Sequence, residues 1–261
     1  MNVIVFSKDR ACQLDLLLRS MKRFWKEFLD IEIHVMYRYV DQSFKAGYDK
    51  LIALCPFKNV KWHKRYDFRV ELLKYVNPSD QFTVFFPDDC VFKEPFSTAC
   101  SQFDRFVVDK DVLCFSLRLS PRTTRCLMMG IDNDMPVFQY KGFQWQGLKG
   151  DFGYPMSVDG HIFRTSDLMP ILRKYDYHNP SELEIAMCLE PPKRPFMQCL
   201  DLSPVMNLPL NQVQDMWINP HGNVTAQSLN EKFLNGQTID LSRIEGYNNT
   251  GCHEIIPVYF K

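Results

Sequence analysis

Apolar residues follow two alternating patterns along the first third of the chain. Short runs rich in β-branched or aromatic residues, such as 2–7 (NVIVFS) and 81–86 (QFTVFF), are typical of strands buried on both faces of a sheet. The segments between such runs repeat apolar residues every three or four positions, which predicts helices with one buried face. The predicted order is strand 2–7, helix 11–28, strand 31–39, helix 43–55, strand 60–65, helix 67–76 and strand 81–86. This alternation predicts an α/β fold with a mostly parallel central sheet flanked by helices.

The regular alternation ends after residue 92. Strands are predicted at 112–120 and 160–164, and helices at 179–189 and 225–236, with Pro180 near the start of the first and Gly236 at the end of the second. We find neither an internal repeat nor a low-complexity linker, so we expect residues 1–261 to form a single domain.

Charged and polar residues follow three of the predicted strands. In open α/β sheets, ligands bind beyond the carboxyl ends of the strands, near the point where the strand order reverses. We therefore expect one site to gather the residues that follow these strands: Ser7, Lys8, Asp9 and Arg10 after the first strand, Arg38 and Tyr39 after the second, and Asp88 and Asp89 after the fourth. Lys8 and Arg10 can neutralise a diphosphate there, helped by the positive end of the following helix. Taken singly, each is equally well explained as a solvated loop charge.

The adjacent carboxylates of Asp88 and Asp89 repel each other unless a positive charge lies between them. One interpretation is a turn in which each aspartate faces water or caps a helix. The other is a divalent cation, a hard ion that prefers carboxylate oxygens.

Composition narrows the class of protein. Of the 261 residues 46% are apolar, and 31 basic residues balance 31 acidic ones, so the net charge is zero. A zero net charge argues against a nucleic acid as the main partner. The nine cysteines form no CxxC pair, and their irregular spacing favours reduced thiols over a set of disulfides. The start of the chain does not resemble a signal peptide, and no run approaches the length of a transmembrane segment, so we expect a cytoplasmic protein.

The ordered motifs of the chain resemble those of nucleotide-sugar glycosyltransferases of the GT-A fold, in particular family 2-like members. The matching stretches are VIVFSKDRACQLDLLLRSM, TVFFPDDCVF, DGHIFRTSDL, NPSELE and NNTGCHE, which span nearly the whole chain. The resemblance implies that residues 1–95 bind a nucleoside diphosphate-sugar, with a UDP-sugar preferred, and that residues 96–261 bind a glycan or glycoconjugate acceptor and carry catalysis.

The same resemblance assigns roles to the acidic pair. Asp88-Asp89 corresponds to the Asp-x-Asp motif, although Cys90 stands where the last carboxylate is usual. Asp89 would then bind Mn²⁺ or Mg²⁺, and Asp88 would contact the ribose or a metal-bound water. His253 would be a further metal ligand if the C-terminal tail folds back. The alternative is that this lone histidine has only a structural role.

An inverting transfer also needs a base for the acceptor hydroxyl. We expect Glu184 in this role and Asp159 as a sugar or acceptor contact, with the opposite assignment left open. The ordinary alternatives are a helix-dipole role for Glu184 and a turn role for Asp159. Arg69 is a candidate nucleobase contact or else a surface ion-pair partner. The competing functions are a sugar nucleotidyltransferase and a nucleotide-sugar or glycan-binding module without catalysis.

Overall fold

The computed structural model describes residues 1–214, 216 and 219–261, and it contains an eight-stranded mixed sheet with the order β3-β2-β1-β4-β10-β6-β11-β9. Strands β1 to β4 are parallel, β10 is antiparallel to both β4 and β6, and β11 is parallel to β6. The expected α/β fold with a mostly parallel sheet is therefore confirmed.

The strands of this sheet are β1 (Asn2–Lys8), β2 (Ile33–Arg38), β3 (Val60–Lys64), β4 (Phe82–Pro87), β6 (Val112–Ser116), β9 (Phe143–Gln144), β10 (His161–Arg164) and β11 (Phe196–Cys199). Two short ladders pair β5 (Cys90–Phe92) with β12 (Val205–Asn207), and β7 (Arg125–Cys126) with β8 (Ile131–Asp132). The α-helices are α1 (Ala11–Phe24), α2 (Gln42–Leu54), α3 (Phe68–Tyr75), α4 (Ser101–Val108), α5 (Thr165–Lys174), α6 (Pro180–Leu189) and α7 (Ala226–Leu234). Short 3₁₀ turns lie at η1 (Phe28–Asp30), η2 (Gly150–Gly153) and η3 (Leu241–Arg243).

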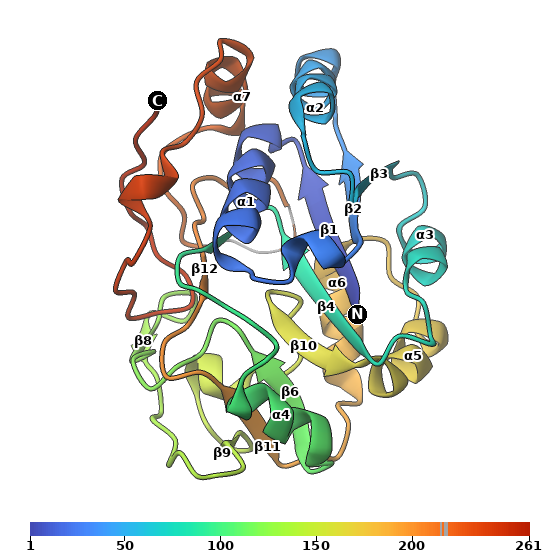
Figure 1. Ribbon diagram of the computed structural model, residues 1–261, viewed down its shortest axis with the longest axis vertical. Helices are drawn as coiled ribbons and strands as arrows, with labels where there is room; N and C mark the ends of the chain where they lie inside the picture. Colours follow the sequence, from blue (N-terminus) through green and yellow to red (C-terminus); the bar gives the residue numbers. More distant parts are fainter. Residues whose placement is uncertain (215, 217–218) are drawn as a thin grey trace.

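Two apolar clusters cover the two faces of the sheet. Successive side chains of a strand point to opposite faces, and Val3 and Val5 accordingly join one cluster while Ile4 and Phe6 join the other. The first cluster contains residues of α1, α2, α4 and α7, and the second contains residues of α3, α5 and α6. Figure 1 shows α1 in front of the sheet and α6 behind it.

Most of the predicted elements are confirmed within one or two residues, with two clear differences. The helix predicted at 11–28 ends at Phe24, because Trp25 is extended, pairs with Phe96 and stacks on Phe92 at 5.6 Å. The strand predicted at 112–120 ends at Ser116, where the Ser116 hydroxyl accepts hydrogen bonds from the Arg118 and Leu119 amides. Helices α4 and α5 and strand β12 were not predicted.

The strand order places a ligand-binding crevice between β1 and β4. From β1 the chain moves outward through β2 and β3 on one side, and β4 lies on the other side. Such a reversal leaves a crevice at the carboxyl ends of the strands.

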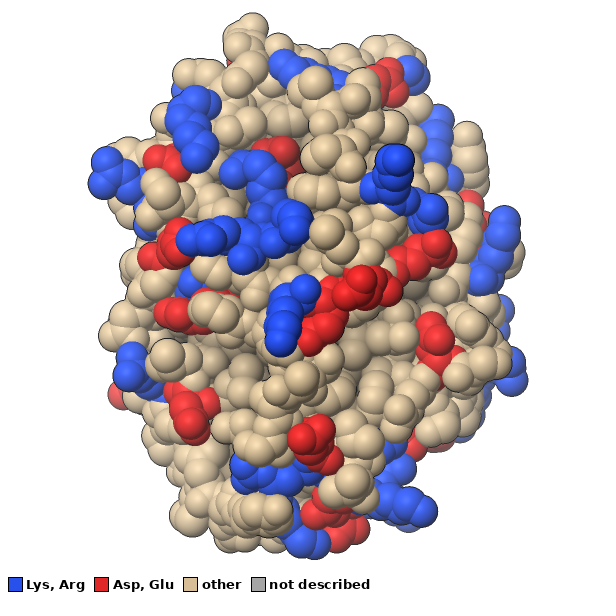
Figure 2. Space-filling model, viewed as in Figure 1, with Lys and Arg blue, Asp and Glu red and all other residues tan. Residues whose placement is uncertain are grey.

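Within the described residues, no helix is long and apolar enough to cross a membrane. Figure 2 shows basic and acidic side chains interspersed over one face of the molecule.

Candidate active site

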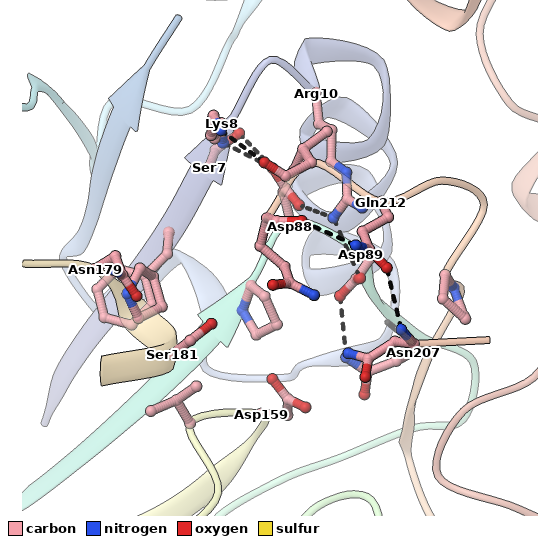
Figure 3. Close-up of a pocket in the computed structure, with 18 of the residues that line it drawn as sticks. Ser7, Lys8, Arg10, Asp88, Asp89, Asp159, Asn179, Ser181, Asn207 and Gln212 are labelled. Atoms are coloured by element: carbon pink, nitrogen blue, oxygen red, sulfur yellow. Dashed lines mark hydrogen bonds and ion pairs between the residues drawn. The ribbon is translucent and has the colours of Figure 1, made fainter. Parts of the chain in front are cut away.

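A cavity of about 390 Å³ lies at this crevice. The ends of β1, β2 and β4 form one side, the start of α6 and the turn before β10 form another, and the end of β12 and the loop that follows it contribute lining residues among 207–214, 216 and 219–221. Of the candidate residues, the cavity is lined by Ser7, Lys8, Arg10, Arg38, Asp88, Asp89, Asp159, Glu184 and His253. In Figure 3, Asp159 lies across the cavity from Asp88 and Ser7.

Asp88 is a buried junction between β1 and β4. Its carboxylate accepts hydrogen bonds from the Ser7 hydroxyl at 2.8 Å and the Lys8 amide at 3.1 Å, and it pairs with Arg10 at 3.0 Å (Figure 3). Burial raises the pKa of Asp88 to about 6, although Arg10 acts in the opposite direction. Asp88 thus holds the two strand ends together as well as lining the cavity.

The positive charge between the two aspartates is the guanidinium of Arg10. This side chain is only 8% exposed, and its Nη1 lies 3.0 Å from Asp88 Oδ1 and 3.3 Å from Asp89 Oδ2. Its Nε donates to Asn211 Oδ1 at 2.7 Å, and its Nη2 donates to the Asn211 carbonyl. Arg10 therefore neutralises the acidic pair and ties it to the loop, which leaves little of its charge for a diphosphate. Lys8 is also tied to this loop, because its Nζ donates to the Val213 carbonyl at 2.6 Å.

Asp89 and His253 lie on either side of Asn207. The Asn207 side chain donates to Asp89 Oδ1 at 3.0 Å, and the Leu208 amide donates to the Asp89 carbonyl at 2.7 Å. On the other side, Asn207 and His253 form a parallel bridge. The C-terminal tail does fold back, and it brings His253 to the same cavity as Asp89.

One carboxylate and one imidazole at this corner of the cavity are ligand types that a divalent cation accepts, while both carboxylate oxygens of Asp89 also bond within the protein, to Arg10 and Asn207. A carboxylate and an imidazole are suitable ligands for Mn²⁺, and Mg²⁺ typically binds through one or two protein carboxylates with the rest from substrate phosphates and water. In the described part of the chain, no three His, Cys, Asp or Glu side chains converge as metal ligands. A cation here would therefore take at most two such ligands from these residues, Asp89 and His253.

Asp159 is held as an anion by two neighbours. Its Oδ2 lies 3.1 Å from Arg118 Nη1 and 3.7 Å from His253 Nε2. Burial works to raise the pKa of Asp159, but Arg118 and His253 outweigh burial and the pKa lies below its ordinary value. Arg118 is buried and also donates to Asn207 Oδ1 at 3.0 Å and Ser157 Oγ at 2.9 Å.

Glu184 has the opposite electrostatic environment. It lies in the second turn of α6 and accepts a hydrogen bond from the Val158 amide at 3.0 Å. Burial, followed by the negative charge of Asp159, raises the pKa of Glu184 to about 7. The carboxyl groups of Asp159 and Glu184 therefore have pKa values that are pushed apart, a pattern that often separates the acid and base roles of an enzyme.

Two arginines line the cavity without an ion pair to a described carboxylate, although Asp9 interacts electrostatically with Arg38, and Glu71 with Arg65. Arg38 ends β2, and Arg65 follows β3, where its amide donates to the Tyr37 carbonyl at 2.8 Å. Burial and then the like charge of Arg38 lower the pKa of Arg65 to about 10. Two guanidinium groups that repel each other in one cavity are suited to an anionic ligand.

Three candidate residues do not line the cavity. Asp9 turns inward: with φ of 58°, it accepts a hydrogen bond from the Val40 amide at 2.8 Å and joins the ends of β1 and β2. The Lys64 ammonium lies over the Tyr39 ring, 4.5 Å from the centroid of that ring. Arg69 is tied to the end of α5, donating to the Tyr175 and Arg173 carbonyls at 2.8 and 2.7 Å.

Sequence reasoning missed Arg65, Arg118 and Asn207. Arg65 ends a predicted strand, as Arg38 does, so the strand-end rule would have found it. Arg118 stands in the apolar run LCFSLRL, where a lone charged residue is a signal of a buried partner. Asn207 has no signal in the sequence, because its role depends on two segments that are distant along the chain.

No protein-family model matches the sequence. The chain is 24% identical over 257 residues to the bifunctional glycosyltransferase pgtA of Dictyostelium discoideum, which covers 84% of this chain and 33% of the relative. It thus spans about a third of the length of that curated relative. Its sequence therefore resembles a glycosyltransferase, as its motifs predicted.

Two solved glycosyltransferase structures show weaker likeness. The apo form of the bifunctional enzyme WbbM is 15% identical, covering 77% of this chain and 38% of that one, with a TM-score of 0.33. An active-site mutant of LgtC is 12% identical, covering 89% of this chain and 95% of that one, with a TM-score of 0.37. Because both TM-scores are below 0.5, the architecture described above rests on the strand order of this chain alone.

Proposed function

We propose that this protein is a glycosyltransferase that moves a sugar from a nucleoside diphosphate-sugar, with a UDP-sugar preferred, to a hydroxyl group of a glycan or glycoconjugate. The reaction is assisted by Mn²⁺ or Mg²⁺ and inverts the anomeric centre. The observation that carries the proposal is one cavity, at the switch point of the sheet, that combines unpaired guanidinium groups with a carboxyl group whose pKa is about 7.

The donor diphosphate binds at the β1–β2–β3 side of the cavity. Arg38 and Arg65 supply positive charge and form no ion pair with a described carboxylate, and Lys8 lies at the end of β1 nearby. Asp89 and His253 would hold the divalent cation, which would supply positive charge to offset that of the departing nucleoside diphosphate. Positive charge placed before the reaction stabilises the leaving group as its negative charge develops.

The acceptor hydroxyl loses its proton to Glu184. A base is most effective when its pKa is near the working pH, because it is then ionised and still basic enough to accept a proton. The pKa of Glu184 meets this condition, whereas the Asp159 carboxylate is a weaker base beside Arg118. Asp159 instead accepts a hydrogen bond from the donor sugar or the acceptor.

The two alternatives are less well supported. Sugar nucleotidyltransferases usually have a glycine-rich loop after the first strand, and the segment SKDRACQ contains no glycine. A binding module without catalysis has no need for a carboxyl group with a pKa near neutrality.

The first experiment measures the thermal stability of the protein with UDP, GDP and CDP, each with and without Mn²⁺. We expect one nucleotide to raise the Tm, and to raise it more when Mn²⁺ is present. Hydrolysis of the matching nucleotide-sugars then separates an enzyme from a binding module. Stabilisation without turnover of any donor, in the presence of candidate acceptors, would refute the enzyme and leave the binding module.

A further inference from the structure

A second cavity of about 40 Å³ lies apart from the first and shares no lining residue with it. It is lined by Lys93, Glu94, Ser120, Arg122, Leu202, Ser203, Gly246, Tyr247, Asn248 and Asn249. A water needs at least about 10–15 Å³, so this cavity has room for roughly three waters or for an ion the size of phosphate.

Lys93 is the unusual residue of this cavity. It is 3% exposed, yet its ammonium has no hydrogen bond or ion pair within the part of the chain that the structure describes. Its backbone is fixed on both sides, because its amide donates to the Pro204 carbonyl and its carbonyl accepts from the Gly246 amide. Burying a charged side chain to this extent is costly, and burial lowers the pKa of Lys93, although the negative charge of Glu94 acts in the opposite direction.

Several other lining groups can donate hydrogen bonds to a ligand, whereas the Ser203 hydroxyl and the Asn249 amide already donate within the protein. The Arg122 guanidinium lies at the mouth and donates to Asn248 Oδ1 at 3.1 Å, and this leaves the Asn248 amide nitrogen free to donate. The Ser120 hydroxyl accepts from the Arg122 amide at 3.2 Å and keeps its own proton to donate. Glu94 is the single acidic side chain of the lining, so the charged groups sum to one positive charge.

We propose that this cavity is a binding site for a small oxyanion, a phosphate or sulfate group, held by Lys93 and Arg122 with the hydroxyl and amide donors around them. A lysine–arginine pair with hydroxyl and amide donors is the usual protein environment of such groups. The oxyanion gives the Lys93 ammonium a hydrogen-bonded counter-ion in addition to the electrostatic influence of Glu94. The proposal does not depend on the proposed transferase activity.

The two cavities lie at opposite ends of the same segments. Three segments each place one residue in the first cavity and another, four positions away, in the second: Asp89 and Lys93, Asn207 and Ser203, His253 and Asn249. The β5–β12 ladder runs between the cavities. An anion at Lys93 is therefore a separate ligand and not an extension of the donor site.

The test measures the reactivity of the Lys93 amine in the intact protein. Trace acetylation followed by mass spectrometry gives the rate at Lys93 and, in the same sample, at Lys58, which is exposed and lines neither cavity. Inorganic phosphate, sulfate and methyl phosphate are titrated at constant ionic strength with chloride as the balancing anion. At ten times the Kd of the anion, we expect about tenfold protection of Lys93 and none of Lys58.

Two variants locate the effect. Arg122→Gln, at an exposed position, should weaken the protection of Lys93 about tenfold, whereas Arg38→Gln, in the first cavity, should leave it unchanged. Protection by methyl phosphate as strong as that by phosphate indicates that the site accepts the group on a larger molecule, and protection by phosphate alone indicates the free ion. The proposal is overturned if none of the anions protects Lys93, or if Arg38→Gln removes the protection and Arg122→Gln does not.

Discussion

The substitution Glu184→Gln removes the proposed base while keeping the size of the side chain and its ability to accept the hydrogen bond from the Val158 amide. If Glu184 accepts the acceptor proton, kcat falls by about 10²- to 10⁴-fold, the usual contribution of a general base. The affinity for the donor changes little, because the carboxylate makes no ground-state contact with the diphosphate in this proposal.

The same substitution changes the pH dependence of both activity and stability. The pKa of Glu184 is raised from 4.5 to about 7 in the folded protein, so wild-type kcat should rise with pH through about 7 and the variant should lose this limb. A raised pKa contributes stability that is complete below about pH 4.5 and is lost as the pH rises through about 7. The shift corresponds to at most about 3 kcal/mol. Glu184→Gln should therefore be more stable than wild type at pH 8 while being nearly inactive.

The assay compares transfer rates between pH 5.5 and 9 with urea unfolding at pH 5 and pH 8. The matched control is Glu182→Gln on the same helix. Glu182 lines neither cavity and accepts hydrogen bonds from the His178 amide and the Asn179 side chain at the helix start. We expect this control to lose some stability and keep its kcat. Full activity of Glu184→Gln together with an inactive Asp159→Asn would show that the base is Asp159.

Three further predictions concern the charged groups of the first cavity. Asp89→Ala should abolish Mn²⁺-dependent nucleotide binding measured by calorimetry, and binding that keeps its Mn²⁺ dependence would rule out Asp89 as a ligand. Arg10→Met should lower the free energy of unfolding by about 3–5 kcal/mol, because it leaves buried acidic charge unpaired; urea unfolding checks this, and a loss below about 1 kcal/mol would contradict the pairing. Arg65→Gln should weaken UDP binding about tenfold, which corresponds to roughly 1.4 kcal/mol. The control Arg69→Gln lies outside the cavity and should leave UDP binding unchanged. Equal effects of the two substitutions would refute the proposed location of the diphosphate beside Arg65.

Local sequence patterns were sufficient to predict most of the strands and helices in the first third of the chain. Strands β1 to β4 and the helices between them were predicted because buried strands need continuous apolar runs and amphipathic helices need a repeat of three or four. Strand β12, with three residues, is too short for a period to be recognised. Trp25 was placed in a helix by its spacing, whereas its aromatic contacts with Phe92 and Phe96 draw it out of the helix.

Part of the charged lining of the cavity was predicted from the strand ends alone. The rule that ligands bind at the carboxyl ends of parallel strands gathered Lys8, Arg38 and Asp89 correctly at one cavity. It failed for Asp9 and Tyr39, because consecutive residues in a turn point in different directions and only some of them face the crevice.

The sequence by itself determined the class of fold and the edge of the sheet at which charge would gather, since both follow from the order and spacing of nearby residues. Only the tertiary structure decided which charged side chains form ion pairs within the protein and which can still bind a ligand. Arg10 is paired with Asp88, 78 residues away, while Arg38 and Arg65 form no ion pair with a described carboxylate. The pKa of Glu184 is likewise set by burial and by Asp159, a residue on a different segment. Electrostatic energy depends on distance and solvent exposure in three dimensions, and neither quantity is encoded in spacing along the chain.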